Sequence, residues 1–169
     1  MAAALLLWGC AAAGRSLPAA DVQIIVGVPP FGEQTRGDDC AGVALASLLG
    51  HAGVAVPAAE IDAAVYDPRL GGALLPDLER FAAKVGAKPR SGRGSVAQMH
   101  RLLQAGRPVL VPIDLGWGLW RRPHYVVVYG AGVDSVLMHV RRDDVREMLL
   151  SEFERRWSAM GRLYLYLEP

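Results

Sequence analysis

The chain has 169 residues, of which 52% are hydrophobic and 21% are charged, and its formal net charge is +1. This length favours a single domain, and this composition is typical of a globular protein rather than a disordered one. The 18 basic residues, sixteen of them arginines, are spread along the sequence without forming a stripe, which argues against a nucleic-acid-binding surface.

The first twenty residues, MAAALLLWGCAAAGRSLPAA, differ in composition from the rest of the chain. A short apolar run leads to Cys10, and the tetrad LWGC at residues 7–10 resembles the bacterial lipoprotein box, in which the cysteine is recognised for lipid attachment. We therefore expect residues 1–20 to be a signal and lipoprotein-type segment with Cys10 as the lipidation site. Residues 21–169 would then form a domain exported to the periplasm or cell envelope. A frayed N-terminus is the alternative.

Apolar periodicity predicts helices in the first half of this domain. After a strand in residues 21–29 and a polar loop, helical spacing begins at Cys40 and ends near Gly50. Further helices are expected to begin at Pro57, near Pro76 and after Ser95. Ser95 and Gln98 have the spacing of a capping box, which fixes the start of the last of these helices.

After Gly106 the pattern changes from helical to extended. β-Branched runs bounded by turn residues predict strands in residues 108–113, 124–130 and 135–140, and strict alternation predicts a final strand in residues 163–167. Ser151 and Glu154 have capping-box spacing and predict one more short helix before that strand. Helices followed by an antiparallel sheet indicate an α+β domain.

Cys40 lies where the stretch QTRGDDCAGVALASLL passes from a polar loop into an apolar helix. If Cys10 is removed or lipidated, Cys40 is the only remaining thiol, and it is either a nucleophile or a buried, inert cysteine. A helix N-terminus favours a thiolate, although Asp38 and Asp39 oppose its ionisation. The Gln34 amide and the Cys40 main-chain N–H would supply two donors to an oxyanion.

The general base must come from elsewhere in the chain. His51 lies at the far end of the helix that Cys40 begins, and His100 lies on a polar helix face. His124 opens the apolar strand HYVVVYG, where its ring could project into a cleft, and it is our candidate base. A histidine that merely begins a strand is the simpler alternative.

The loop GWGLWRRPH precedes His124. Trp117, Trp120 and Arg122 within it are candidate substrate-binding residues that would form a lip for an extended peptide or a glycan; the alternative is a hydrophobic plug that closes the sheet. No metal site and no cofactor are expected, because the four histidines are scattered and neither H-x-x-x-H nor C-x-x-C occurs.

The chain carries an ordered set of features: Gln34, Cys40 at a helix start, and then the segments AGRPVLVPI, HYVVVYG and LSEFERRW. This ordered set resembles that of the bacteriocin-processing double-glycine peptidases. These are papain-like cysteine peptidase domains of bacterial exporters and of stand-alone secreted proteins and lipoproteins. The resemblance covers residues 23–168 and implies a helical half packed on an antiparallel sheet, with a cleft between them. It also implies that Cys40 is the nucleophile, His124 the general base and acid, Gln34 the oxyanion donor, and a peptide or protein the substrate.

The chain departs from this family at the third catalytic position, where an aspartate is usual and Val140 stands instead. His139 is the alternative group that would orient His124. The pattern of Asp39-Cys40, His124 and a second histidine on the next strand also resembles NlpC-type cell-wall endopeptidases. A catalytically impaired peptidase fold that only binds peptides is the third possibility, since loss of the third residue of a triad lowers turnover strongly.

Overall fold

The computed structural model describes residues 22–28, 31, 39–141 and 144–169, and the whole account below is confined to them. The helices are α1 (Cys40–His51), α2 (Ala58–Val65), α3 (Leu75–Lys84), α4 (Val96–Gln104) and α5 (Leu150–Ser158). The strands are β1 (Val22–Ile25), β2 (Lys88–Arg93), β3 (Val109–Asp114), β4 (Pro123–Gly132), β5 (Ser135–Arg141), β6 (Asp144–Leu149) and β7 (Leu163–Glu168).

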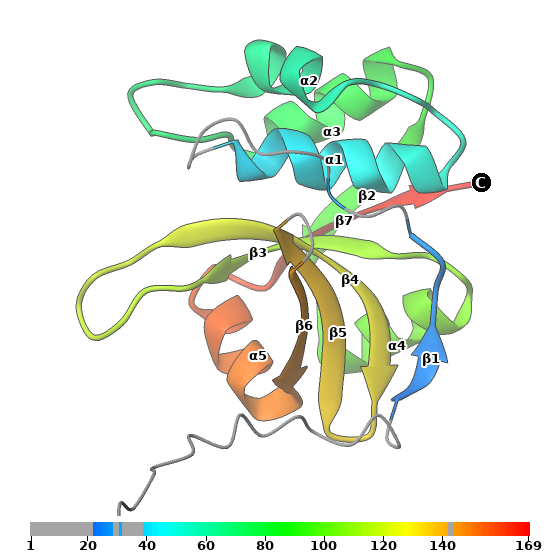
Figure 1. The fold of residues 1–169 in the computed structure, drawn as a ribbon, viewed down its shortest axis with the longest axis vertical. Helices are drawn as coiled ribbons and strands as arrows, with labels where there is room; N and C mark the ends of the chain where they lie inside the picture. The colour runs from blue at the N-terminus through cyan, green and yellow to red at the C-terminus, as the bar shows by residue number, and fades with distance from the viewer. Residues whose placement is uncertain (1–21, 29–30, 32–38, 142–143) are drawn as a thin grey trace, which may run out of the picture.

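The strands form one antiparallel sheet in the order β2-β7-β3-β4-β5-β6, with β1 added to β4. Helices α1, α2 and α3 lie on one face of this sheet, and α4 and α5 lie on the other (Figure 1). Side chains alternate between the two faces of a strand. Tyr125 and Val127 of β4 accordingly pack in the core beneath α1–α3, whereas Val126 and Val128 pack in the core that contains α4 and α5. This confirms the predicted α+β fold.

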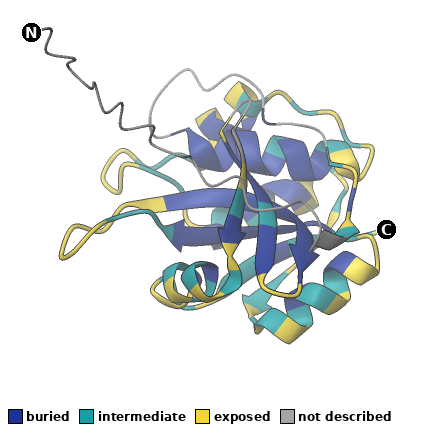
Figure 2. Ribbon diagram, turned by 60° about the horizontal axis from the view of Figure 1, so that its bottom comes forward, coloured by how far each residue is buried: buried dark blue, intermediate teal, exposed yellow. Residues whose placement is uncertain are grey.

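Helix α1 is the central element of the helical layer. Nine of its twelve residues are buried (Figure 2), including the apolar positions Val43, Leu45 and Leu48, so it has no wholly polar face. A helix that is apolar nearly all round must be covered on several sides. Helices α2 and α3 and strand β4 supply that cover, which fixes the N-terminal end of α1 relative to the sheet.

Gly42 allows α2 to approach α1 closely. A Cβ at Gly42 would lie 2.7 Å from the carbonyl oxygen of Ala58 and 3.0 Å from Cβ of Asp62. We expect Gly42→Ala to lower the free energy of unfolding by about 1–3 kcal/mol, because the backbone of α2 must move to admit the methyl group. Gly72→Ala is the matched control, since a Cβ there meets nothing within 4 Å. Equal urea midpoints for the two variants would contradict this explanation.

The starts of the predicted helices are largely confirmed. Helix α1 begins at Cys40, α2 follows Pro57, and the Gln98 main-chain N–H donates to Ser95 Oγ at 3.2 Å, as the capping box requires. The second predicted capping box is wrong. Helix α5 already begins at Leu150, so Ser151 lies inside its first turn and caps nothing.

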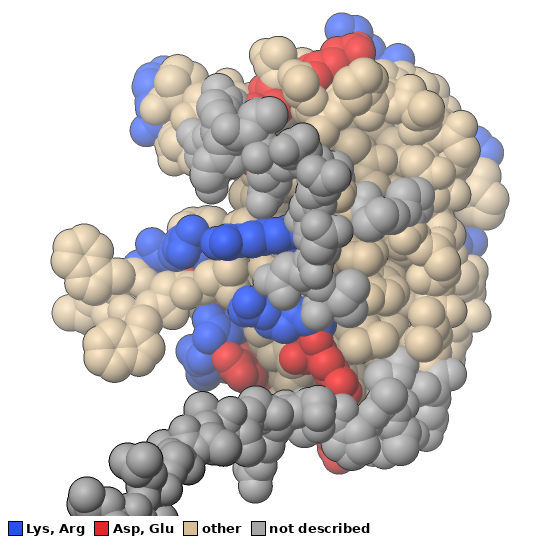
Figure 3. Space-filling view, in the orientation of Figure 1, with Lys and Arg blue, Asp and Glu red and all other residues tan. Residues whose placement is uncertain are grey.

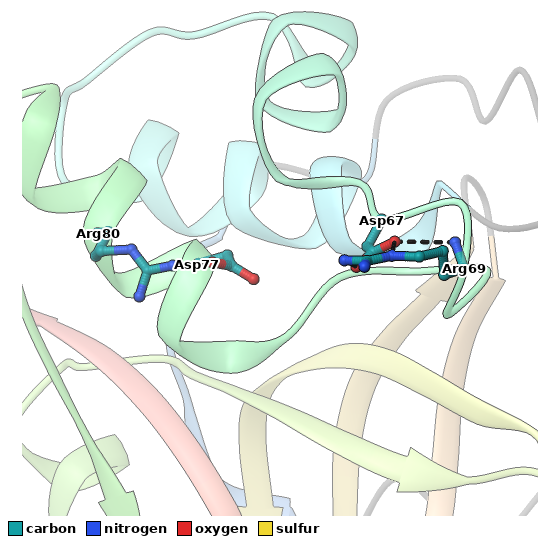
Figure 4. A network of polar contacts seen from close by, with 4 residues as sticks. All are labelled: Asp67, Arg69, Asp77 and Arg80. Atoms are coloured by element: carbon teal, nitrogen blue, oxygen red, sulfur yellow. Dashed lines mark hydrogen bonds and ion pairs between the residues drawn. The ribbon is translucent and has the colours of Figure 1, made fainter.

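The turn between α2 and α3 is held by local contacts (Figure 4). Asp67 accepts hydrogen bonds from the main-chain N–H and the guanidinium of Arg69, with Arg69 Nη2 at 2.8 Å from Asp67 Oδ2. Asp77 pairs with Arg80 one turn along α3. Both arginine side chains are largely exposed, so these pairs add little to stability.

Candidate functional site

Cys40 is the first residue of α1 and is 9% exposed. Main-chain N–H groups of Tyr125, Cys40 and Ala41 act as hydrogen-bond donors to its thiol. Two of these donors belong to the first turn of α1, where N–H groups have no partner within the helix. The third belongs to β4, so the sulfur lies at the peptide unit that joins His124 to Tyr125.

The environment of the thiol favours its neutral form. Burial raises the pKa of Cys40, and the carboxylate of Asp39 raises that pKa further, as the sequence led us to expect. The three main-chain donors act in the opposite direction on the pKa without overcoming the effect of burial. Asp39 holds the N-cap position of α1, but its side chain makes no capping hydrogen bond. Cys40 is therefore a thiol at rest rather than a preformed thiolate.

The site lies where β5 separates from β4. In the described residues the ladder between these strands ends at the pair Val127 and His139, so Tyr125 lies beyond it. On its other side, β4 remains paired with β3, with Ile113 opposite His124. One edge of β4 is thus available to the thiol, while the other edge is fixed in the sheet.

His124 is the second residue of β4 and is 6% exposed. Its Nε2 lies 2.8 Å from the main-chain carbonyl oxygen of Val140 in β5. Because a carbonyl oxygen only accepts hydrogen bonds, Nε2 must carry the proton, and Nδ1 of the neutral ring is left as a proton acceptor. Burial lowers the pKa of His124, so the ring is neutral near pH 7 and can act as a base.

His139 does not support His124 in the contacts of the described residues. Its ring stacks on Tyr129 at a centroid distance of 4.4 Å and lies 5.7 Å from Phe31, and it interacts with the Val28 main chain. It lies opposite Val127, on the α1 side of the sheet, whereas Nε2 of His124 is bonded to Val140. These contacts give no support to the prediction that His139 orients the base, nor to the second histidine of the resemblance to NlpC-type enzymes.

His51, which the sequence analysis rejected as the base, lies at the far end of α1, where it hydrogen bonds with main-chain oxygens of Gly27 and Gly106. Gln34 and Cys10 lie outside the described residues, so the oxyanion and lipidation assignments stay predictions.

Trp117 and Trp120 lie at the tip of the β3–β4 hairpin, which projects from the sheet (Figures 1 and 2), and they are 89% and 84% exposed. The alternative of a hydrophobic plug is therefore wrong. The base of the hairpin is closed by Asp114, whose Oδ1 accepts from the main-chain N–H groups of Gly116 and Arg122 at 2.8 Å each. These hydrogen bonds lower the pKa of Asp114 and keep its carboxylate charged.

The two buried histidines predict a pH-dependent stability. Burial lowers the pKa of both His124 and His139 below the ordinary value of 6.5, so the unfolded chain binds more protons than the native one as the pH falls below that value. We expect urea denaturation to give a free energy of unfolding about 1–2 kcal/mol lower at pH 5.5 than at pH 7.5. His139→Gln should show roughly half of this difference. Equal free energies of unfolding at the two pH values would show that folding does not lower the pKa of either ring.

Within the described ranges, no group of histidine, cysteine, aspartate and glutamate side chains could hold a metal ion. None of the helices in that part of the chain has the length and apolar character needed to cross a bilayer.

Comparison with known proteins identifies one peptidase family and several structures of similar fold. The model of the Peptidase C39 family matches residues 30–166. The peptidase domain of Streptococcus ComA, a bifunctional ABC transporter of a quorum-sensing pathway, is 23% identical, with 84% of this chain and 97% of that domain covered and a TM-score of 0.66. A C39-like peptidase from Bacillus anthracis is 18% identical (86% and 97% covered, TM-score 0.70).

A double-glycine motif protease of an AMS/PCAT transporter, solved with its leader peptide, is 14% identical, with 87% of this chain and 96% of the protease covered and a TM-score of 0.68. No curated protein sequence matches the chain significantly. Because these structural likenesses are all below 25% identity, they show a shared fold, and the family match is what assigns the chain.

Proposed function

Because the chain belongs to the peptidase C39 family, we propose that it hydrolyses peptide bonds with Cys40 as nucleophile and His124 as general base. Family membership makes the chain a cysteine peptidase. The roles of individual residues rest on one observation, the hydrogen bond from His124 Nε2 to the carbonyl oxygen of Val140, which leaves Nδ1 free to accept a proton. The thiol at the neighbouring Tyr125 peptide is the group that would give that proton.

The proposed reaction has two stages. Nδ1 of His124 takes the proton of the Cys40 thiol as the sulfur attacks the scissile carbonyl carbon, and the resulting oxyanion is bound by the Cys40 main-chain N–H and the Gln34 amide. The imidazolium then gives its proton to the leaving amine, which departs and leaves a thioester. Water, deprotonated by the same ring, hydrolyses the thioester and restores the thiol.

The carbonyl oxygen of Val140 takes the place of the carboxylate usual in this family. It orients the ring and fixes its tautomer, but it is neutral and stabilises an imidazolium less than an aspartate would. This difference, with the raised pKa of Cys40, favours the second candidate function, a peptidase fold that binds peptides and turns them over slowly or not at all.

The orienting role of a main-chain group is testable at Val140. Its side chain is 1% exposed in the core that contains α4 and α5, so Val140→Ala should lower the free energy of unfolding by about 2 kcal/mol. Because the carbonyl oxygen remains, kcat/KM measured well below Tm should stay within about threefold of wild type. A loss above tenfold in a folded Val140→Ala variant would mean that the side chain itself positions His124.

The substrate that we propose is a peptide with two consecutive glycines before the scissile bond. The double-glycine protease that shares this fold was solved with its leader peptide, which supports a peptide substrate. The decisive experiment incubates the protein with double-glycine peptides and detects new termini by mass spectrometry. Absence of cleavage, together with saturable peptide binding, would favour the binding function.

We also propose that residues 1–20 export the domain and that Cys10 anchors it to lipid. The sequence LWGC at residues 7–10 supports this proposal. Mass spectrometry of the chain from a bacterial membrane fraction should find the N-terminal peptide beginning at a lipid-modified Cys10. An unmodified N-terminal peptide that begins before Cys10 would refute it.

A further inference from the structure

Three arginines surround the candidate base. Arg122 precedes His124 by two residues, and its main-chain N–H is bonded to Asp114 at the base of the hairpin. Arg141 follows Val140, whose carbonyl oxygen holds the His124 ring. Arg146 of β6 is paired with Met138 of β5. All three side chains are exposed, and all three act electrostatically on His124.

Three described carboxylates near this cluster make their contacts with groups other than Arg122 and Arg141. Asp114 accepts its two main-chain hydrogen bonds, Glu152 pairs with Arg156 at 2.9 Å, and Glu147 accepts from Ser135 Oγ. In the described part of the chain, neither Arg122 nor Arg141 forms an ion pair with a carboxylate. Asp39 acts on the Cys40 thiol and is 5% exposed.

The β3–β4 hairpin combines this charge with an apolar tip. Figure 3 shows basic surface along and below the projecting hairpin, and an indentation of the outline between the hairpin and the helical layer. Trp117, Leu119 and Trp120 at the tip are 89%, 99% and 84% exposed. The hairpin that leads to His124 therefore combines an apolar tip with basic side chains, and acidic side chains adjoin the basic ones below it.

We propose that the substrates of this peptidase carry carboxylate groups close to the scissile bond, which bind Arg122 and Arg141, and an apolar side chain farther along that packs on Trp117 and Trp120. This inference rests on the proposed function and narrows its substrate class. Complementary charge raises the rate of encounter and disfavours partners of the same sign. The carboxylate is either an acidic side chain or the C-terminus of a short peptide.

The test compares matched double-glycine peptides that differ only at positions flanking the scissile bond, with Glu, Gln or Lys there, each as a free acid and as a C-terminal amide. We expect kcat/KM for the Glu peptide to exceed that for the Gln peptide about tenfold in 50 mM salt and clearly less in 500 mM salt. If only free acids show the preference, the terminal carboxylate is the group bound. The double variant Arg122→Gln/Arg141→Gln should reduce the preference to about twofold.

Arg101→Gln is the matched control, because it removes the same charge from an exposed position on α4 and should leave the preference unchanged. Equal kcat/KM for the Glu, Gln and Lys peptides would overturn the inference while leaving the proposed function intact. If the protein cleaves none of these peptides, the proposed function is overturned instead. Anisotropy measurements of peptide binding to Cys40→Ala then decide the charge preference, and equal Kd values for all peptides would overturn it.

Discussion

Replacing Cys40 with alanine is expected to lower kcat for peptide cleavage by at least about 10⁴-fold, because it removes the sulfur of the proposed nucleophile. The main-chain donors at the start of α1 remain in the variant, so peptide binding should change little. Cys40 is the only free cysteine in the described residues. The Cys40→Ala variant should therefore lose peptide cleavage while it keeps peptide binding, which distinguishes the two functions.

The measurement is single-turnover cleavage followed by mass spectrometry, with Kd for the same peptide determined by anisotropy. Cys40→Ser is the informative companion, since a serine hydroxyl fits the site but ionises far less readily than a thiol and should also be almost inactive. Both variants should unfold within about 1 kcal/mol of wild type, because Cys40 buries only a small side chain. Cleavage by Cys40→Ala at more than one hundredth of the wild-type rate would refute Cys40 as the nucleophile.

Local sequence signals predicted the helices well and two of the strands not at all. The start of α1 and the cap of α4 follow from residue type and spacing at a single position. Strand β2 has the sequence KPRSGR, which contains proline and glycine and lacks alternation, and it is extended because it pairs with β7. Strand β6 likewise depends on its partner β5. Pairing between distant segments overrides such weak local preference.

The side chains of the candidate site could be predicted from the sequence, but its main-chain groups could not. Cys40 and His124 have identifiable chemistry, and their positions at the start of a helix and of a strand were readable from the sequence. The Val140 carbonyl oxygen and the Tyr125 N–H are main-chain groups, which every non-proline residue carries, so no residue type marks them. Valine at position 140 indicated a missing acceptor, whereas the structure supplies one from the backbone.

The pKa directions distinguish two modes of thiol catalysis. Burial raises the pKa of Cys40 and lowers that of His124, so both groups are neutral at rest near pH 7. A preformed ion pair would need the opposite order of the two pKa values. In the proposed reaction the proton would then move as the sulfur attacks, as in serine hydrolases, and iodoacetamide should label Cys40 at pH 6 no faster than an ordinary thiol. Fast labelling at that pH would show a preformed thiolate.

His124→Ala is therefore expected to lower kcat/KM at pH 7 by about 10³-fold, within the range that general-base catalysis supplies. The loss should shrink as the pH rises above 9, because hydroxide then ionises the thiol without help from an imidazole. His100→Ala, on α4, is the matched control and should stay within about twofold, since His100 Nε2 has no hydrogen-bond partner among the described residues. A loss below tenfold in His124→Ala, or an equal loss at every pH, would mean that the ring does not carry the proton from Cys40.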